Sequence, residues 1–244
     1  MARYKSYEPE SSDKFRISRT KVDLFLNCAR CFYLDVRLGV KRPAGFPFNL
    51  NSAVDALLKK EFDTYRVAGK PHPYMIEYGI NAIPYTHPDL ETWRSNFKGV
   101  SFYDETTNFE AFGAVDDLWI DTETKEIIVV DYKATSKAEE VTLDADWQIG
   151  YKRQMEFYQW LLRNNGLEVS KQGWFVYCNG IKDNAGFNNN LEFSVKLIPY
   201  VGDSSWITPT MDRIKNCLDS NEVPTNALDC PYCKFALEYQ IYNI

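Results

Sequence analysis

The feature that most constrains the fold of this chain is an apolar run that ends abruptly in charged residues. Residues 127–130, Ile-Ile-Val-Val, are followed at once by Asp131, Tyr132 and Lys133. Four apolar residues in succession are typical of a strand that is buried on both faces. Residues 109–120 are also rich in β-branched and aromatic side chains, and a polar turn, residues 121–125, separates the two segments. The pattern predicts a β-hairpin whose second strand is central in a sheet.

Segments with their own periodicity flank this hairpin. We expect strands at 173–180 and 191–200 and helices at 20–39 (capped by Ser18), 51–66, 148–164 and 205–220. Residues 1–16 are polar and are expected to be a flexible N-terminal segment. Residues 71–104 have weak periodicity and are expected to form an irregular insertion, and 217–244 a cysteine-bearing C-terminal tail. Together these strands and helices predict a single α/β domain over residues 17–244, which includes the insertion and the tail.

Composition limits the classes of function. With 244 residues, 45% of them hydrophobic, the chain can build one large domain or two small ones. The net charge of −6 counts against a protein that wraps DNA, because such proteins are usually basic. It does not exclude an enzyme that meets nucleic acid at one site. No apolar run is long enough to span a membrane and the N-terminus lacks the apolar core of a secretory signal, so we expect a cytoplasmic protein.

The charged end of the apolar run is the candidate site. Asp131 and Lys133 leave the same face of the strand, and Asp116 lies in the preceding strand. Carboxylate oxygens suit Mg²⁺ or Mn²⁺, and such an ion activates a bound water for attack on a phosphate. Lys133 would orient or deprotonate that water, or stabilise the phosphate. The sequence Asp-x-Lys at 131–133 taken alone would also fit the solvated tip of an ordinary hairpin. Its combination with Gly113, Asp116 and the apolar run favours a two-metal-ion-style site.

Residues 113–135 resemble the core of the PD-(D/E)XK nuclease superfamily, in its RecB-like branch. That branch includes the nuclease domains of helicase–nuclease repair complexes and the CRISPR-adaptation nucleases. Asp116 matches the first motif acid, and Asp131 and Lys133 match the D-x-K. The resemblance implies a restriction-endonuclease-like core, in which a central mixed sheet is flanked by helices.

Two further motifs of the branch concern the predicted helices. Its Gln-x-x-x-Tyr motif is present as Gln154 and Tyr158, which the resemblance places beside the active site. Its upstream Gly-x-x-x-His motif is altered, with Asn51 for glycine and Asp55 for histidine. Aspartate can also ligate Mg²⁺ or Mn²⁺, although an exposed helix aspartate is the alternative for Asp55. The implied metal ligands are Asp55, Asp116, Asp131 and the carbonyl of Tyr132, whereas Asp117 points to the other face and is expected to be structural.

Six cysteines include two Cys-x-x-Cys pairs, Cys28 with Cys31 and Cys230 with Cys233. Four thiolates suit Zn²⁺ or an iron–sulfur cluster, and the two pairs taken alone favour zinc. In many RecB-like nucleases one N-terminal cysteine joins three C-terminal ones around a [4Fe-4S] cluster, but no cysteine follows Cys233 here. With Cys31 as fourth ligand, the resemblance leads us to expect a [4Fe-4S] cluster that joins the two ends of the chain, with structural Zn²⁺ as the alternative. Cys178 and Cys217 are expected to be packing residues.

The expected function is a Mg²⁺- or Mn²⁺-dependent deoxyribonuclease, an exonuclease rather than an endonuclease, in DNA repair, recombination or CRISPR-related processing. Its substrate would be single-stranded DNA or duplex ends. The sequence has no ATPase segment, so any helicase or CRISPR-adaptation protein would be a separate partner. Two alternatives remain open. One is a catalytically weak DNA-binding or assembly subunit with the nuclease fold, favoured by the altered helix motif and the acidic charge. The other is a zinc-stabilised protein-interaction module.

Overall fold

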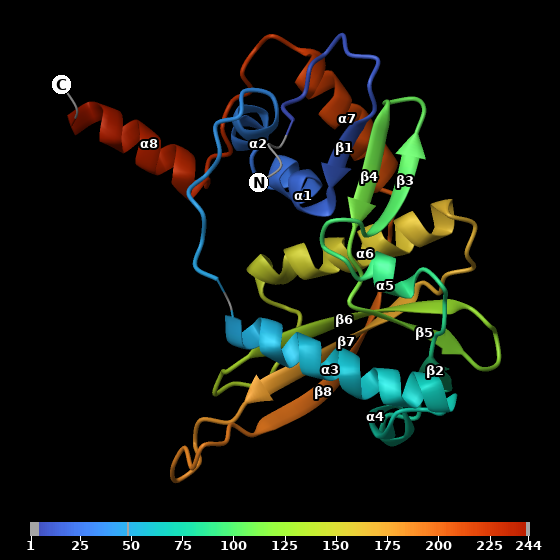
Figure 1. Cartoon of the computed structure of the whole chain (residues 1–244). Coiled ribbons are helices and arrows are strands. Elements are labelled where there is room, and N and C mark those ends of the chain that lie inside the picture. The colour runs from blue at the N-terminus through green and yellow to red at the C-terminus, as the bar shows by residue number, and fades with distance from the viewer. Residues whose placement is uncertain (1–4, 48, 243–244) are drawn as a thin grey trace. The chain divides into compact units, whose positions relative to one another are not determined.

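The computed structural model describes residues 5–47 and 49–242, and its elements are shown in Figure 1. Contacts between residues divide the chain into two compact units. Unit 1 takes the described residues of 1–46, 101–112 and 205–244, and unit 2 takes those of 47–100 and 113–204. The expected single domain over residues 17–244 therefore stays a prediction. No helix in the described ranges combines the length and apolarity that a membrane crossing requires.

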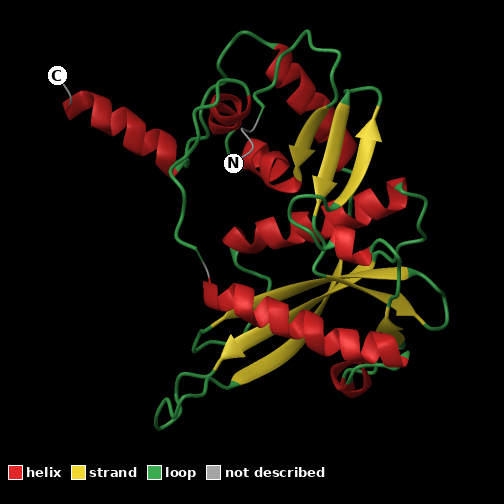
Figure 2. Cartoon of the chain, viewed as in Figure 1, coloured by secondary structure: helices red, strands yellow, loops and turns green. Residues whose placement is uncertain are grey.

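Unit 2 is built on a twisted five-stranded sheet with the order β2-β5-β6-β7-β8 (Figure 2). The β5–β6 and β7–β8 pairs are antiparallel, whereas β6 and β7 are parallel, so the sheet is mixed. Helices α3 and α6 both contact β6. The predicted mixed sheet flanked by helices is confirmed. The strands of unit 2 are β2 Ala82–Pro84, β5 Asp117–Asp121, β6 Ile127–Thr135, β7 Gln172–Gly180 and β8 Phe193–Val201. Its helices are α3 Asn49–Ala68, α4 Pro73–Glu77, α5 Leu90–Trp93, the 3-10 turn η1 Asp146–Gln148 and α6 Ile149–Asn164.

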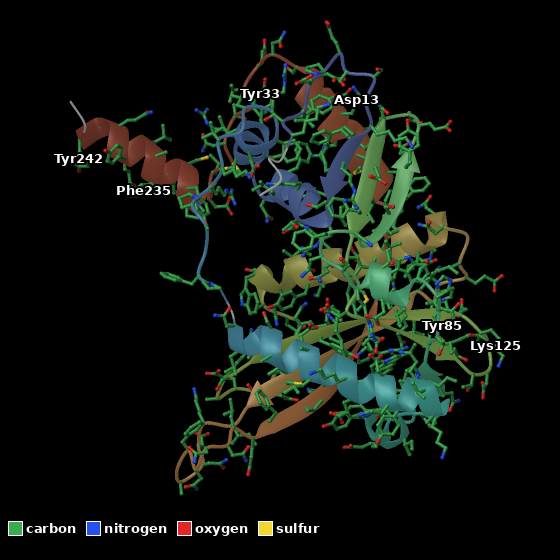
Figure 3. The ribbon with its side chains drawn as sticks, viewed as in Figure 1. Asp13, Tyr33, Tyr85, Lys125, Phe235 and Tyr242 are labelled. Atoms are coloured by element: carbon green, nitrogen blue, oxygen red, sulfur yellow. The ribbon has the colours of Figure 1, made fainter. Side chains whose placement is uncertain are left out.

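Strand β6 is buried on both faces, as its apolar run predicts. Ile128, Val130 and Tyr132 share one cluster with Leu58 and Phe62 of α3. Successive residues of a strand point to opposite faces, so Val129, Asp131 and Lys133 point the other way, where Lys133 reaches Gln154 of α6. The hairpin turn to β5 contains Lys125, which is labelled in Figure 3. Its φ of 65° lies in the left-handed region.

The continuous strand expected over residues 109–120 is wrong. Phe109–Gly113 forms β4 in the sheet of unit 1, and Asp117–Asp121 forms β5 in the sheet of unit 2. A hydrogen bond stabilises the segment between β4 and β5, because the N–H of Val115 donates to the carbonyl of Trp93 at 3.1 Å. The backbone of Gly99, at a φ of +67°, passes so close to Gly113 that a Cβ there would lie 2.5 Å from its carbonyl oxygen. Asp116 therefore lies in a connection between two sheets and not within a strand.

Unit 1 combines a small sheet with four helices. Its strands have the order β1-β4-β3, with β1 Phe15–Ser18 parallel to β4 and β3 Val100–Asp104 on the other side. Residues 1–4 of the expected flexible segment lie outside the described residues. In the remainder, Tyr7 is 5% exposed and its ring packs edge-on against Phe15 and Phe109. The helices are α1 Arg19–Asn27, α2 Ala29–Val36, α7 Ile207–Asp219 and α8 Pro231–Tyr242.

The helix expected over residues 20–39 starts as predicted but is not continuous. Ser18 caps α1 by accepting from the N–H of Lys21, which confirms the predicted cap. Cys28 then adopts an extended conformation, with φ −165° and ψ 104°, and α2 starts after it. This break gives Cys28 a position outside both helices, from which its sulfur lies 3.8 Å from that of Cys233. In the predicted tail, α8 presents apolar side chains to solvent, among them Phe235 and Tyr242 (Figure 3).

Candidate functional site

The centre of the candidate site is Asp131, whose side chain is fully buried in unit 2. One carboxylate oxygen, Oδ2, forms an ion pair with the ammonium group of Lys133. The other, Oδ1, has no hydrogen-bond donor among the described residues. Burial raises the pKa of Asp131 to about 7, because Lys133 only partly offsets it and the nearby Asp116 carboxylate adds to it. A buried carboxylate with a free oxygen and a raised pKa is a place where a proton or a metal ion binds favourably.

Asp116 is held beside Asp131 by the backbone of β6. Its Oδ2 accepts a hydrogen bond of 2.9 Å from the N–H of Tyr132, and its Oδ1 lies 3.6 Å from Nζ of Lys59. Lys59 also donates to Oδ2 of Asp55 at 2.8 Å. Burial and the charge of Asp116 raise the pKa of Asp55, against the opposing effect of Lys59 and Lys133. Helix α3 thus contributes Asp55 to the same group of charges.

Lys59 is a site residue that the sequence analysis missed. It follows Asp55 by four residues, the spacing of an ion pair on one helix face. That spacing was the available signal, but it occurs equally on solvated helices and does not predict the second contact with Asp116.

Helix α6 supplies the polar residues of the Gln-x-x-x-Tyr motif. Nζ of Lys133 donates to Oε1 of Gln154 at 3.5 Å, and Nε2 of Gln154 donates to the hydroxyl of Tyr158 at 3.1 Å. The ammonium group of Lys133 also lies 4.6 Å from the ring centre of Tyr151. Burial disfavours the charged lysine, but Asp131 and Asp116 outweigh it and raise the pKa of Lys133. Lys133 is therefore a fixed cation in contact with a carboxylate, a side-chain amide and an aromatic ring.

Asp117 has a structural role, as expected. It is fully buried, and its Oδ1 accepts from Arg66 at 2.5 Å and from Arg94 at 2.7 Å. Its Oδ2 accepts from the hydroxyl of Tyr132 at 2.7 Å. These contacts fix the first residue of β5, which directly follows Asp116. The buried charges are paired, as burial requires.

The seven predicted residues of the carboxylate site therefore lie in one connected group, in which Lys59 bridges Asp55 to Asp116 and the N–H of Tyr132 joins Asp116 to β6; the members are Asp55, Asp116, Asp131, Tyr132, Lys133, Gln154 and Tyr158. A small pocket beside it is lined by Asn51, Asp55 and Tyr151, among others. The carboxylates are ion-paired to lysines, Asp55 and Asp116 to Lys59 and Asp131 to Lys133. The oxygen donors and the free Oδ1 of Asp131 fit Mg²⁺ or Mn²⁺.

The four expected cysteine ligands meet in unit 1. Their sulfurs all lie within 4.8 Å of one another, and none of the four residues is more than 6% exposed. Burial disfavours the thiolate of Cys28, but hydrogen bonds from the backbone of Ala227 and Cys31 to its sulfur outweigh this and lower its pKa to about 6. Nη2 of Arg42 lies 3.4 Å from the sulfur of Cys230. This group joins the first helices to the C-terminal segment and can ligate a metal.

The other two cysteines lie outside this group. Cys178 packs in the core between α3 and the sheet of unit 2, and burial raises its pKa to about 11. Cys217 lies in α7 and is partly buried. Both positions agree with the predicted packing role.

Comparisons with known proteins identify a family and a similar solved structure. The sequence model described as the PD-(D/E)XK nuclease superfamily matches residues 50–236, a range that contains the whole carboxylate site. Among solved structures, the chain is similar to one titled "Crystal structure of SSO0001". The two are 15% identical, with a TM-score of 0.39 over 93% of this chain and 87% of that chain. The search of curated proteins found no significant match.

Proposed function

Because the chain belongs to the PD-(D/E)XK nuclease superfamily, we propose that it is a Mg²⁺- or Mn²⁺-dependent deoxyribonuclease of the RecB-like branch. The observation that carries this proposal is the connected group of Asp116, Asp131 and Lys133, with Gln154 and Tyr158 behind the lysine. It lies inside the range that the family matches.

Each residue has a role that follows from its contacts. Asp131 and Asp116 would hold the divalent ion, with Asp55 and the carbonyl of Tyr132 as further ligands. The bound ion would supply a Lewis acid and lower the pKa of a coordinated water. Lys133 has a raised pKa and stays protonated, so it acts as an electrostatic stabiliser of the phosphate and not as a general base.

Gln154 and Tyr158 act through Lys133 as positioning residues. The carbonyl oxygen of Gln154 accepts from Lys133, and its amide nitrogen donates to Tyr158. The amide orientation is thereby fixed, since a flipped amide would turn its NH₂ group toward the ammonium. An ammonium held in one place costs less reorganisation when charge develops on the phosphate.

The test is a cleavage assay with end-labelled single-stranded and duplex DNA, in Mg²⁺, Mn²⁺ or EDTA. We expect cleavage only with the metal ions, and a loss of at least about 100-fold in Asp131→Asn and Lys133→Ala. Asp183→Asn and Lys171→Ala make the same chemical changes at exposed positions and should retain full activity. Wild-type rates in either site variant would refute the assigned site.

A second substrate separates exonuclease from endonuclease action. Covalently closed circular DNA has no ends, so we expect it to resist the enzyme while the linear form of the same molecule is degraded. The RecB-like resemblance also leads us to propose a role in DNA repair, recombination or CRISPR-related processing, with a helicase or a CRISPR-adaptation protein as partner. Cleavage of the closed circle would replace the exonuclease assignment by an endonuclease.

One observation favours a weakly catalytic DNA-binding or assembly subunit instead. Asp55 stands where the branch has histidine, and Lys59 pairs with both Asp55 and Asp116. A lysine in that place competes with a divalent ion for the carboxylates. DNA binding without metal-dependent cleavage in the assay above would support this second function.

A further inference from the structure

The distances between the four cysteine sulfurs distinguish one bound ion from a cluster. The sulfur of Cys31 lies 3.6 Å from that of Cys230 and 3.5 Å from that of Cys233. Cys28 lies 3.8 Å from Cys233, and no two of the four sulfurs are more than 4.8 Å apart. The four sulfurs therefore form one compact group.

A single zinc ion requires four sulfurs at about this spacing. With Zn–S bonds of about 2.3 Å, the sulfurs at the corners of a tetrahedral site are about 3.8 Å apart. A [4Fe-4S] cluster places a different iron under each cysteine, so the cube itself separates the four sulfurs to about 6 Å. The spacing fits a mononuclear site and does not fit the cluster that the RecB-like resemblance implies.

Each Cys-x-x-Cys pair is built into the start of a helix. Cys28 directly precedes α2 and Cys230 directly precedes α8, so that each Cys-x-x-Cys pair occupies the first turn of a helix. Leu24 and Ala227 pack against the four sulfurs. Widening the group would require the N-terminal ends of α2 and α8 to move apart and these contacts to open.

Arg42 adds a charge argument that suits the same site. A zinc ion with four thiolates carries a net charge of −2, which is costly to bury without a nearby cation. The guanidinium group of Arg42 lies 3.4 Å from the sulfur of Cys230, and it is stacked over the ring of Tyr232 at 4.4 Å. The ring keeps the positive charge beside the sulfurs, so Arg42 acts as a positioning and charge-balancing residue.

We propose that Cys28, Cys31, Cys230 and Cys233 hold one tetrahedral Zn²⁺ ion in place of a [4Fe-4S] cluster, with Arg42 as its charge partner. The site is structural, since all four ligands are protein thiolates and none is left for water or substrate. This proposal is independent of the nuclease activity.

The test is metal and sulfide analysis of the full chain, expressed with ample iron and purified without oxygen, so that a cluster would survive. We expect about one zinc per chain, no acid-labile sulfide and no absorbance band near ~400 nm. Replacement by Co²⁺ should give the intense visible bands of a tetrahedral thiolate site. About four irons and four sulfides per chain would overturn the proposal, and so would protein with neither metal.

Variants locate the zinc and test Arg42. Cys31→Ser should lose the ion, whereas Cys178→Ser and Asp131→Asn should keep about one per chain, which separates this centre from the carboxylate site. Because Cys31→Ser can misfold, Arg42→Ala provides a milder change. We expect it to fold and to release zinc to a chelator about 10- to 100-fold faster than the wild type. Release of zinc from Arg42→Ala at the wild-type rate would show that Arg42 does not stabilise the centre. Retention of zinc in Cys31→Ser would show that the ion binds at other residues.

Discussion

Lowering the pH from about 8 to about 6 should weaken Mn²⁺ binding at the carboxylate site about tenfold. As a proposed metal ligand, Asp131 would bind the ion in its ionised form, and burial raises its pKa to about 7. At that pKa about 90% of the carboxylate is ionised at the higher pH and about 10% at the lower, a ratio that corresponds to about 1.4 kcal/mol. An aspartate with an ordinary pKa would be ionised at both values and would give no change.

The same group should affect the stability of the metal-free protein in the opposite direction. Since its pKa is higher in the folded chain than in the unfolded chain, folding takes up a proton between about pH 4 and about pH 7. The contribution of Asp131 to stability is therefore lost as the pH rises through about 7. Between about pH 6 and about pH 8 it should cost about 1.4 kcal/mol in EDTA. Lys133 has a raised pKa and stays protonated in this window, so it adds no step.

Calorimetric titration with Mn²⁺ measures the first effect, and urea unfolding in EDTA measures the second. Mn²⁺ is the suitable probe because it competes poorly for thiolates and leaves the cysteine centre intact. In the unfolding experiment, Asp131→Asn is the matched control, since its amide does not titrate. A Mn²⁺ affinity that differs less than twofold between the two pH values would show that protonation of Asp131 does not control metal binding. So would an unfolding free energy whose pH dependence is the same in the wild type and in Asp131→Asn.

Three further predictions concern single residues. Asp55→Ala should weaken metal binding by about 10- to 100-fold, whereas Asp55→His should retain Mn²⁺-dependent cleavage; unchanged metal dependence in Asp55→Ala would make Asp55 a surface residue. Asp117→Ala should lower the free energy of unfolding by about 3–5 kcal/mol, because it leaves Arg66 and Arg94 without their buried partner; a loss below about 1 kcal/mol in urea unfolding would contradict this. Cys31→Ser should lower the melting temperature far more than Cys178→Ser, because only Cys31 belongs to the group that joins the two ends of the chain; equal shifts in thermal unfolding would argue against a structural centre.

The central part of the fold could be predicted because its signals are local. The apolar run of β6, the strong strand segments of β7 and β8 and the periodicity of α6 each identify their element without the rest of the chain. The meeting of the two cysteine pairs was also predictable, because their spacing has one common chemical explanation. These features depend on residue type and short spacing alone.

The predictions from sequence were wrong or incomplete where tertiary contacts determine the local structure. Residues 109–120 alternate well enough for one strand, and only the close approach of Gly99 to Gly113 reveals that the chain changes sheets there. The periodicity of the first predicted helix continues through Cys28. The helix nevertheless breaks there, and the sulfur of Cys28 lies 3.8 Å from that of Cys233, a residue far away in the sequence. The contact of Lys59 with Asp116 joins residues far apart in the sequence, and a charged helix residue gives no sign of such a partner.

The joining of Cys31 to Cys230 has a consequence for synthesis on the ribosome. The two residues are 199 positions apart in the chain, so at roughly 5–20 residues per second the second pair emerges about 10–40 s after the first. During that interval only two of the four cysteines, Cys28 and Cys31, are present, and they are open to oxidation or to capture of a wrong metal. All of unit 2, which ends at Ser204, is already synthesised before α7 and α8 appear. The nascent chain can therefore form the five-stranded sheet of unit 2 before the cysteine centre is complete.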